Sequence, residues 1–156
     1  MWGAQLSRAR TAKNVAYMHT RWSDDDLCLL EIERGDPRGQ ARVEAYTLLL
    51  AINTWQELIL SSQGRLAVRG DALGVLQDVL KMRARDPVLN DVTSEIALIL
   101  APQGGDIRAA HVWSERNETC DILSRLNSES TGVLKGLECA IQSKPRRVRG
   151  TMLGKR

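Results

Sequence analysis

The period of the apolar residues changes near position 40, and this change constrains the fold more than any other feature. Between Gln40 and Leu60, apolar side chains recur at intervals of three and four: Ala41, Ala45, Leu48, Leu49, Ile52, Trp55 and Ile59. That spacing predicts an amphipathic helix with a wide buried face. Before it, "VAYMHTRW" alternates apolar and polar residues, as a half-buried strand does.

The remaining segments predict an α/β protein. Strands are expected over residues 2–11, 14–22 and 27–34 before the long helix, then over 64–71 and 106–113 after it. Helices are expected over 72–85, 86–101 and 118–126, with Asp86 as N-cap and Pro87 at the first helical position of the second. An antiparallel meander followed by alternating strands and helices predicts a mixed sheet covered by helices.

Composition places the chain among single-domain intracellular proteins. A chain of 156 residues suffices for one domain, and 43% hydrophobic and 26% charged residues are ordinary for a soluble one. Phe is absent, so aliphatic residues and four Trp must fill the core. No apolar run of about 18 residues is present, and residues 1–14 are not expected to form a signal peptide. Cys28, Cys120 and Cys139 fit neither a disulfide framework nor a zinc site. A reducing compartment, cytoplasmic or nuclear, is therefore expected.

Positive charge gathers at the C-terminal end. The last fourteen residues contain six Lys or Arg and no acid, which leaves 16 basic and 19 acidic residues in the remainder. We expect a domain over residues 1–127 and a flexible basic tail over 128–156. Such a tail fits contact with nucleic acid, and it equally fits a solvated end that buries no core.

Three carboxylates stand where solubility alone does not require them. Glu44 lies beside the buried face of the long helix, and Asp71 directly follows the strand "LAVRG". Asp121 lies in the first turn of the expected last helix, among apolar neighbours. Ligand sites of α/β sheets gather at the carboxyl ends of strands. Each acid also has a structural interpretation: a partner of the helix dipole for Glu44 and Asp121, or an N-cap for Asp71.

Taken together, the three acids resemble the ribonuclease H superfamily, and most of all the ribonuclease H domain of retrotransposon reverse-transcriptase polyproteins. The resemblance is carried by "VEAYTLLLAINTW", "LAVRGDALGVL" and "HVWSERNETCDILSRL", in that order. The last is similar to a family pattern of His-Val, a short loop, Asn, then Asp-x-Leu-Ser-Arg. "GDPRGQARVEA" resembles the linker before the catalytic Glu. The similarity runs from about Trp2 to Leu126.

The resemblance implies a ribonuclease H-like fold with a mixed five-stranded sheet and Mg²⁺-dependent hydrolysis of RNA in RNA–DNA hybrids. Glu44, Asp71 and Asp121 are then the catalytic and metal-binding acids of a two-ion site, in which carboxylates from different elements converge. The hybrid is contacted through phosphates and 2′-hydroxyls by four candidates: Arg69, Arg116, Asn117 and Arg125. An upstream reverse-transcriptase region would be the natural partner.

Two departures from the family weaken the expected activity. The family's first catalytic Asp lies in the first strand, whereas here no acid precedes Asp24 and the chain is expected to begin just downstream of that Asp. Asp24, Asp25 and Asp26 are expected in a solvated charged turn, from which replacing the missing Asp requires reaching the middle of the sheet. The loop "SERN" also lacks the His found in some cellular members, and His111 is expected at a strand end. We therefore predict an impaired enzyme.

Two other functions stay open. One is a nucleic-acid-binding module without catalysis, led by the basic tail. The other is a small α/β interaction domain in which the three acids are caps and surface charges on separate faces. Trp22 and Trp55 are expected in the core in every case, while Trp113 could stack on a base or pack.

Overall fold

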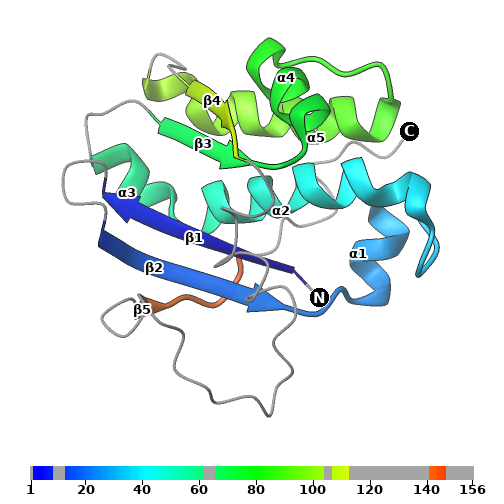
Figure 1. Cartoon of the computed structure of the whole chain (residues 1–156), viewed down its shortest axis with the longest axis horizontal. Coiled ribbons are helices and arrows are strands. Elements are labelled where there is room, and N and C mark those ends of the chain that lie inside the picture. The colour runs from blue at the N-terminus through cyan, green and yellow to red at the C-terminus, as the bar shows by residue number, and fades with distance from the viewer. Residues whose placement is uncertain (1, 9–12, 62–65, 104–106, 113–140, 147–156) are drawn as a thin grey trace.

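The computed structural model describes residues 2–8, 13–61, 66–103, 107–112 and 141–146, and it is a mixed α/β structure (Figure 1). In chain order, its elements are β1 (Trp2–Arg8), β2 (Lys13–Thr20), α1 (Asp24–Leu29), a 3₁₀ turn (Pro37–Gly39), α2 (Gln40–Thr54), α3 (Gln56–Ser61), β3 (Leu66–Gly70), α4 (Leu73–Lys81), α5 (Pro87–Leu100), a second 3₁₀ turn (Ala101–Gln103), β4 (Ile107–His111) and β5 (Ile141–Gln142).

The strands form two separate sheets. β1 and β2 are an antiparallel hairpin, as predicted, and β5 pairs in parallel with β2. β3 and β4 form a parallel pair in register from Leu66 opposite Ile107 to Gly70 opposite His111. The expected single five-stranded sheet is not seen, because no strand in the described part of the chain pairs with both β1 and β3.

The strand predicted over residues 27–34 is wrong, because residues 27–29 belong to helix α1. Ser23 is its N-cap: the Ser23 hydroxyl accepts from the Asp26 amide at 3.1 Å, and the Asp26 carboxylate accepts from the Ser23 amide at 2.9 Å. This reciprocal capping box satisfies amides at the start of the helix. The helix ends at Leu29, its C-cap Leu30 is buried, and Glu31 then turns the chain with φ +52°.

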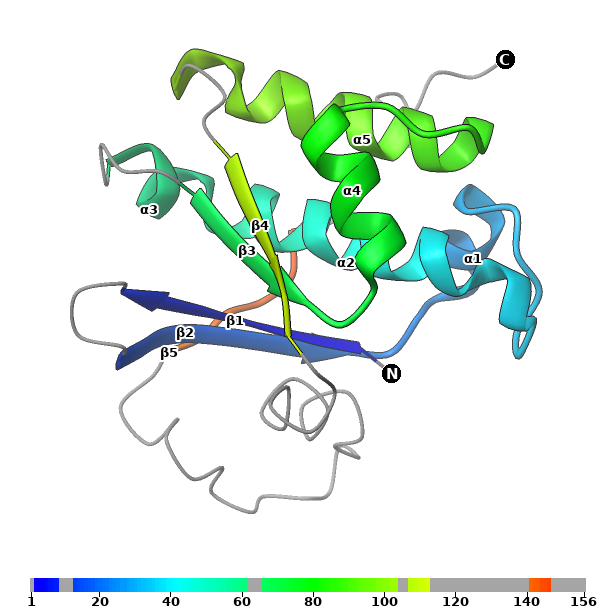
Figure 2. The same cartoon turned by 45° about the horizontal axis from the view of Figure 1, so that its top comes forward.

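Helix α2 lies in the middle of the molecule, between β1 on one side and α4 and α5 on the other (Figures 1 and 2). The helix predicted over residues 40–60 is interrupted at Trp55, where the backbone leaves helical geometry before α3 begins. Because α2 is covered on several sides, its buried residues are not confined to one narrow stripe. Tyr46, Leu49 and Leu50 are almost fully inaccessible to solvent.

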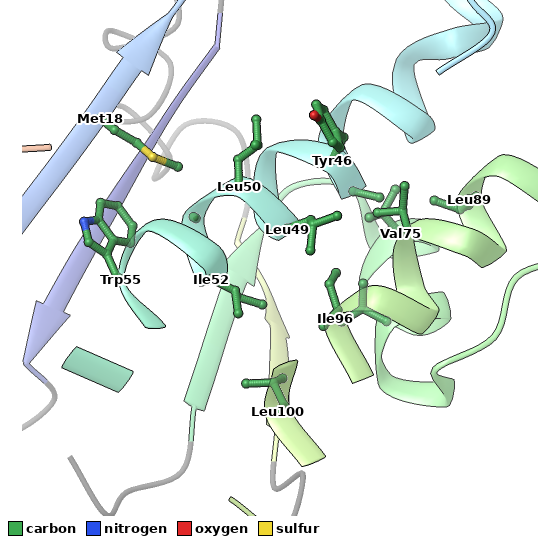
Figure 3. Close-up of a cluster of buried hydrophobic side chains, with 14 of the residues drawn as sticks. Met18, Tyr46, Leu49, Leu50, Ile52, Trp55, Val75, Leu89, Ile96 and Leu100 are labelled. Carbon is green, nitrogen blue, oxygen red and sulfur yellow. The ribbon is translucent and has the colours of Figure 1, made fainter. Parts of the chain in front are cut away.

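The hydrophobic core surrounds α2 (Figure 3). Met18 of β2 and Trp55 approach it from the side of the hairpin, while Val79 of α4 and Ile96 of α5 approach from the other. Fully burying an aliphatic side chain of this size contributes about 1.5–3 kcal/mol. Trp55 is buried, and Trp22 packs at the edge of the core, with its ring 6.0 Å from that of Tyr46. Both tryptophans thus serve packing, as expected.

Helix α5 begins as predicted. Asp86 is the N-cap and accepts from the Leu89 amide at 2.9 Å, and Pro87 occupies the first turn. The helix predicted over residues 72–85 is shorter, since α4 ends at Lys81 and Met82 adopts a left-handed conformation. Cys28 is exposed and not disulfide-bonded, whereas Cys120 and Cys139 lie outside the described residues. No helix in the described ranges has the length and apolar character needed to cross a membrane.

Residues 141–146, within the segment expected to be a tail, pack against the body. Beyond β5, the Ser143 amide donates to the Tyr17 carbonyl at 2.8 Å, and the Trp55 indole donates to the Ser143 hydroxyl at 3.0 Å. The Arg146 amide donates to the Thr54 hydroxyl at 2.8 Å. The first residues of the basic segment are therefore held at the carboxyl end of α2.

Candidate functional site

Two of the three predicted acids share one pocket. Glu44 projects from the second turn of α2, and Asp71 follows the last residue of β3 directly. Both line a pocket of about 490 Å³, whose other walls are Pro37, Gln40, Ala41, Ala72, Gly74, Val75 and Asp78. The pocket lies where the 3₁₀ turn, the start of α2 and the loop between β3 and α4 meet. For this pair, the interpretation that places the acids on separate faces is wrong.

The Glu44 carboxyl has an unusual environment. Burial raises its pKa above the ordinary value, and the negative charge of Asp71 raises it further. A hydrogen bond from the Gln40 side-chain amide to the Glu44 carboxylate, 2.9 Å long, opposes these two effects without cancelling them. Desolvation and a like charge both favour the protonated form of a carboxyl group. A cation in the pocket would favour the charged form and so offset both effects.

Sequence reasoning missed two members of the pocket. Gln40 stands four residues before Glu44 on α2, and this spacing places the two side chains on the same helical surface. The four-residue spacing of Gln40 and Glu44 could therefore have been recognised in the sequence. Asp78 reaches the pocket from α4, seven residues after Asp71. Its contribution depends on how α4 packs against α2, which local spacing does not reveal.

The end of β4 holds the backbone around Asp71. The Val112 amide donates to the Gly70 carbonyl at 2.9 Å, and the His111 ring nitrogen Nε2 lies 3.1 Å from the Asp71 carbonyl oxygen. His111 stands at the end of its strand, as expected. Asp71 itself is exposed.

The other predicted site residues are distributed as follows. Asp121, Arg116, Asn117 and Arg125 lie outside the described residues, as does Trp113. Arg69 is exposed on β3, opposite Ala110 of β4.

Asp24, Asp25 and Asp26, which were expected in a charged turn poorly placed to replace the missing Asp, belong to α1. Asp26 is buried in the capping box, and Asp24 forms an exposed ion pair with Arg34 at 2.9 Å. Asp25 is also exposed. Asp24 and Asp26 are therefore engaged within or near their own helix. The expected solvated turn is instead the first turn of a helix.

The donor set of the pocket suits a hard cation but offers few ligands. In the described part of the chain, no group of three or more His, Cys, Asp or Glu side chains is arranged to hold a metal ion. Glu44 and Asp71 supply carboxylate oxygens, which Mg²⁺ prefers, and Mg²⁺ often keeps several waters while binding only one or two carboxylates. The pair thus supplies the type of ligand that one hydrated Mg²⁺ takes. The two-ion site that the resemblance implies would also need Asp121, which lies outside the described ranges.

No family model, no curated protein and no solved structure matches the chain.

Proposed function

We propose that this chain is a ribonuclease H-like domain of retroelement origin, whose ancestral reaction is Mg²⁺-dependent hydrolysis of RNA in RNA–DNA hybrids. The observation that carries the proposal is the shared pocket of Glu44 and Asp71. They come from a helix and from the carboxyl end of a strand, and their charges interact. Converging carboxylates from different elements are what metal-assisted phosphodiester hydrolysis needs.

In this proposal, Glu44 and Asp71 hold a divalent cation. When bound, Mg²⁺ would supply Lewis-acid activation of the scissile phosphate and its attacking water. The chain's own contribution is to keep Glu44 near a second negative charge in a partly buried position, which favours exchanging its proton for a metal ion. Gln40 restrains the Glu44 carboxylate by its hydrogen bond. Asp121 would complete the set from the segment after β4.

The proposal includes the finer fold, in which both sheets belong to one mixed sheet. Each of β1 and β3 has one edge that no described strand pairs. In the proposed fold these two edges belong to one mixed sheet, and the family's first catalytic Asp lies in its first strand. Because no acid precedes Asp24 in this sequence, we expect the chain by itself to hydrolyse hybrids weakly or not at all.

Substrate contact is assigned to phosphates and 2′-hydroxyls. Arg69 precedes Asp71 by two residues on an exposed strand position, and its guanidinium suits a phosphate. Arg116, Asn117 and Arg125 would contact the hybrid from the segment around Asp121. These contacts read the shape of the duplex and not its sequence.

The first test is metal binding. Mn²⁺, which reports binding by its paramagnetism, is titrated into the full chain and into Glu44→Gln and Asp71→Asn variants, with Asp25→Asn as the matched control on an exposed acid. We expect saturable binding that each pocket variant weakens by at least tenfold and that the control leaves unchanged. Equal affinity in all four proteins would overturn the proposed pocket function.

The second test is hydrolysis of a labelled RNA–DNA hybrid with Mg²⁺ or Mn²⁺. We expect little or no turnover by the chain alone. Robust turnover that Asp71→Asn abolishes would keep the nuclease assignment but overturn the predicted impairment.

A second candidate function is nucleic-acid binding without catalysis, and the packed segment 141–146 favours it. Lys144 and Arg146 are exposed, and Arg146 is held at the carboxyl end of α2, which lies about 15 Å along the helix from Glu44. Binding that is salt-dependent, lost when residues 143–156 are deleted and retained in Glu44→Gln would favour this function. Retained binding after that deletion would exclude it.

A further inference from the structure

We propose that His111 is the positioning residue of the pocket: its imidazole holds the backbone of Asp71 and thereby sets the direction of the Cα–Cβ bond from which the carboxylate extends. The inference rests on the proposed cation-binding function of Glu44 and Asp71. It concerns a residue that sequence reasoning placed at a strand end with no role.

Packing does not orient Asp71. The residue is exposed, and it follows β3 before the first residue of α4. An exposed carboxylate on a connecting loop has several accessible rotamers, and its reach depends on where the backbone directs the Cα–Cβ bond. For Asp71 to stay near Glu44, the backbone at residue 71 must therefore be held in place.

The end of β4 holds the peptide units on both sides of the Asp71 Cα. The Val112 amide binds the Gly70 carbonyl at 2.9 Å, which fixes the peptide plane before Asp71. The His111 ring contacts the Asp71 carbonyl at 3.1 Å, which fixes the plane after it. Because each peptide unit is planar, two anchored planes determine both backbone dihedrals between them and hence the Cα–Cβ direction. His111 supplies the second of these two anchors.

The contact with the Asp71 carbonyl determines which nitrogen of the His111 ring carries a hydrogen. A carbonyl oxygen can only accept a hydrogen bond, so the contact requires a hydrogen on Nε2 of His111. A residue at this position needs a donor of similar reach, which the side-chain amide of Gln provides and the methyl group of Ala does not. Hydrogen bonds of this supporting kind, made to metal-binding residues and not to the metal, typically change metal affinity by about tenfold or more.

The test compares His111→Ala with His111→Gln in the full chain, with Gln77→Ala as a control at an exposed, uncharged position of α4. Two quantities are measured: the ¹⁵N order parameters of Asp71 and Ala72, and the affinity for Mn²⁺. For His111→Ala we expect lower order parameters and roughly tenfold weaker Mn²⁺ binding. His111→Gln should restore most of both, and the control should change neither.

Unchanged order parameters at Asp71 in His111→Ala would overturn the inference, as would lower order without a change in Mn²⁺ affinity. Equal weakening by His111→Ala and His111→Gln would also overturn it, since it would show that the hydrogen bond is not the cause. If the native chain binds no Mn²⁺, the proposed function falls. The order parameters then still decide whether His111 anchors the peptide unit.

Discussion

Arg42 connects three helices through one guanidinium group. Its Nη1 donates to the carbonyls of Leu30 and Glu31, at 2.9 and 3.1 Å, where α1 ends. Its Nε and Nη2 donate to the Asp86 carboxylate, with a shortest distance of 2.6 Å, where α5 begins. Since Arg42 lies two residues before Glu44 on α2, this connection also holds the helix that carries the pocket.

The loss expected from Arg42→Met follows from this geometry. Methionine keeps an unbranched apolar side chain but no donor, so the Asp86 carboxylate and two carbonyls lose their partner. Hydrogen bonds to charged groups contribute about 1.5–3 kcal/mol when buried. The Arg42 and Asp86 side chains are 21% and 37% exposed, so water compensates part of the loss. We expect destabilisation by about 2–3 kcal/mol.

The variant Asp86→Asn removes the charge of the Asp86 side chain but keeps its ability to cap α5. Asparagine is an equally good N-cap, so the bond to the Leu89 amide remains while the ion pair disappears. We expect a loss of about 1 kcal/mol and, in the double variant with Arg42→Met, a coupling energy of about 1 kcal/mol.

The coupling should disappear in acid. Burial by itself would raise the pKa of Asp86, but hydrogen bonds from Arg42 and the Leu89 amide outweigh it and lower the pKa. A carboxyl group whose folded pKa is lowered stabilises the protein above its unfolded pKa, near 3.9, and loses that contribution as the pH falls through the folded value. Urea unfolding of the four proteins at pH 7 and pH 3 measures both quantities. A coupling energy below about 0.3 kcal/mol at pH 7, or one that is unchanged at pH 3, would refute this reasoning.

Three further predictions follow from burial and hydrogen bonding. Glu44→Gln should raise the melting temperature at pH 7, because a carboxyl whose folded pKa is raised destabilises the fold once ionised. This gain in melting temperature should vanish below about pH 4, and a gain that is independent of pH would contradict the prediction. Ile96→Ala should lower the free energy of unfolding, measured with urea, by about 2–4 kcal/mol. Leu98→Ala, at a residue 67% exposed, should change it by less than about 0.5 kcal/mol. Equal losses in the two variants would contradict the burial of Ile96 in the core. Trp55→Phe removes the indole bond to Ser143 and should destabilise by about 1 kcal/mol and speed amide exchange at that residue; exchange at the native rate would show that the bond does not hold the segment.

Local signals in the sequence predicted several elements well. The start of α5 was predicted correctly because both of its signals act within one helical turn. The Asp86 side chain caps the helix, and the ring of Pro87 fixes its φ. The β1–β2 hairpin was predicted correctly because the alternation of apolar and polar residues is a local pattern. The error at α1 arose because the apolar run "LCLLEI" has no clear period. Ser23 and Asp26 carried the better signal, since their spacing matches a capping box.

Features that depend on long-range packing were beyond local reasoning. The break at Trp55 reflects where α2 meets the hairpin and the segment 141–146, which is remote in sequence. The division into two sheets depends on which strands are available to pair, and strand pairing is a non-local property. Asp78 and His111 escaped notice as site residues for the same reason, since their roles come from neighbours on other elements.

The sequence by itself determined the α/β class, the central helix, the capped start of α5 and the candidacy of Glu44 and Asp71, because periodicity, capping and strand ends act over a few residues. Only the tertiary structure decided that these two acids meet in one pocket and that β4 holds the backbone beside one of them. Contacts of that kind depend on how α2, α4 and the β3–β4 pair are packed together, and such packing is set by the whole core and not by any one segment.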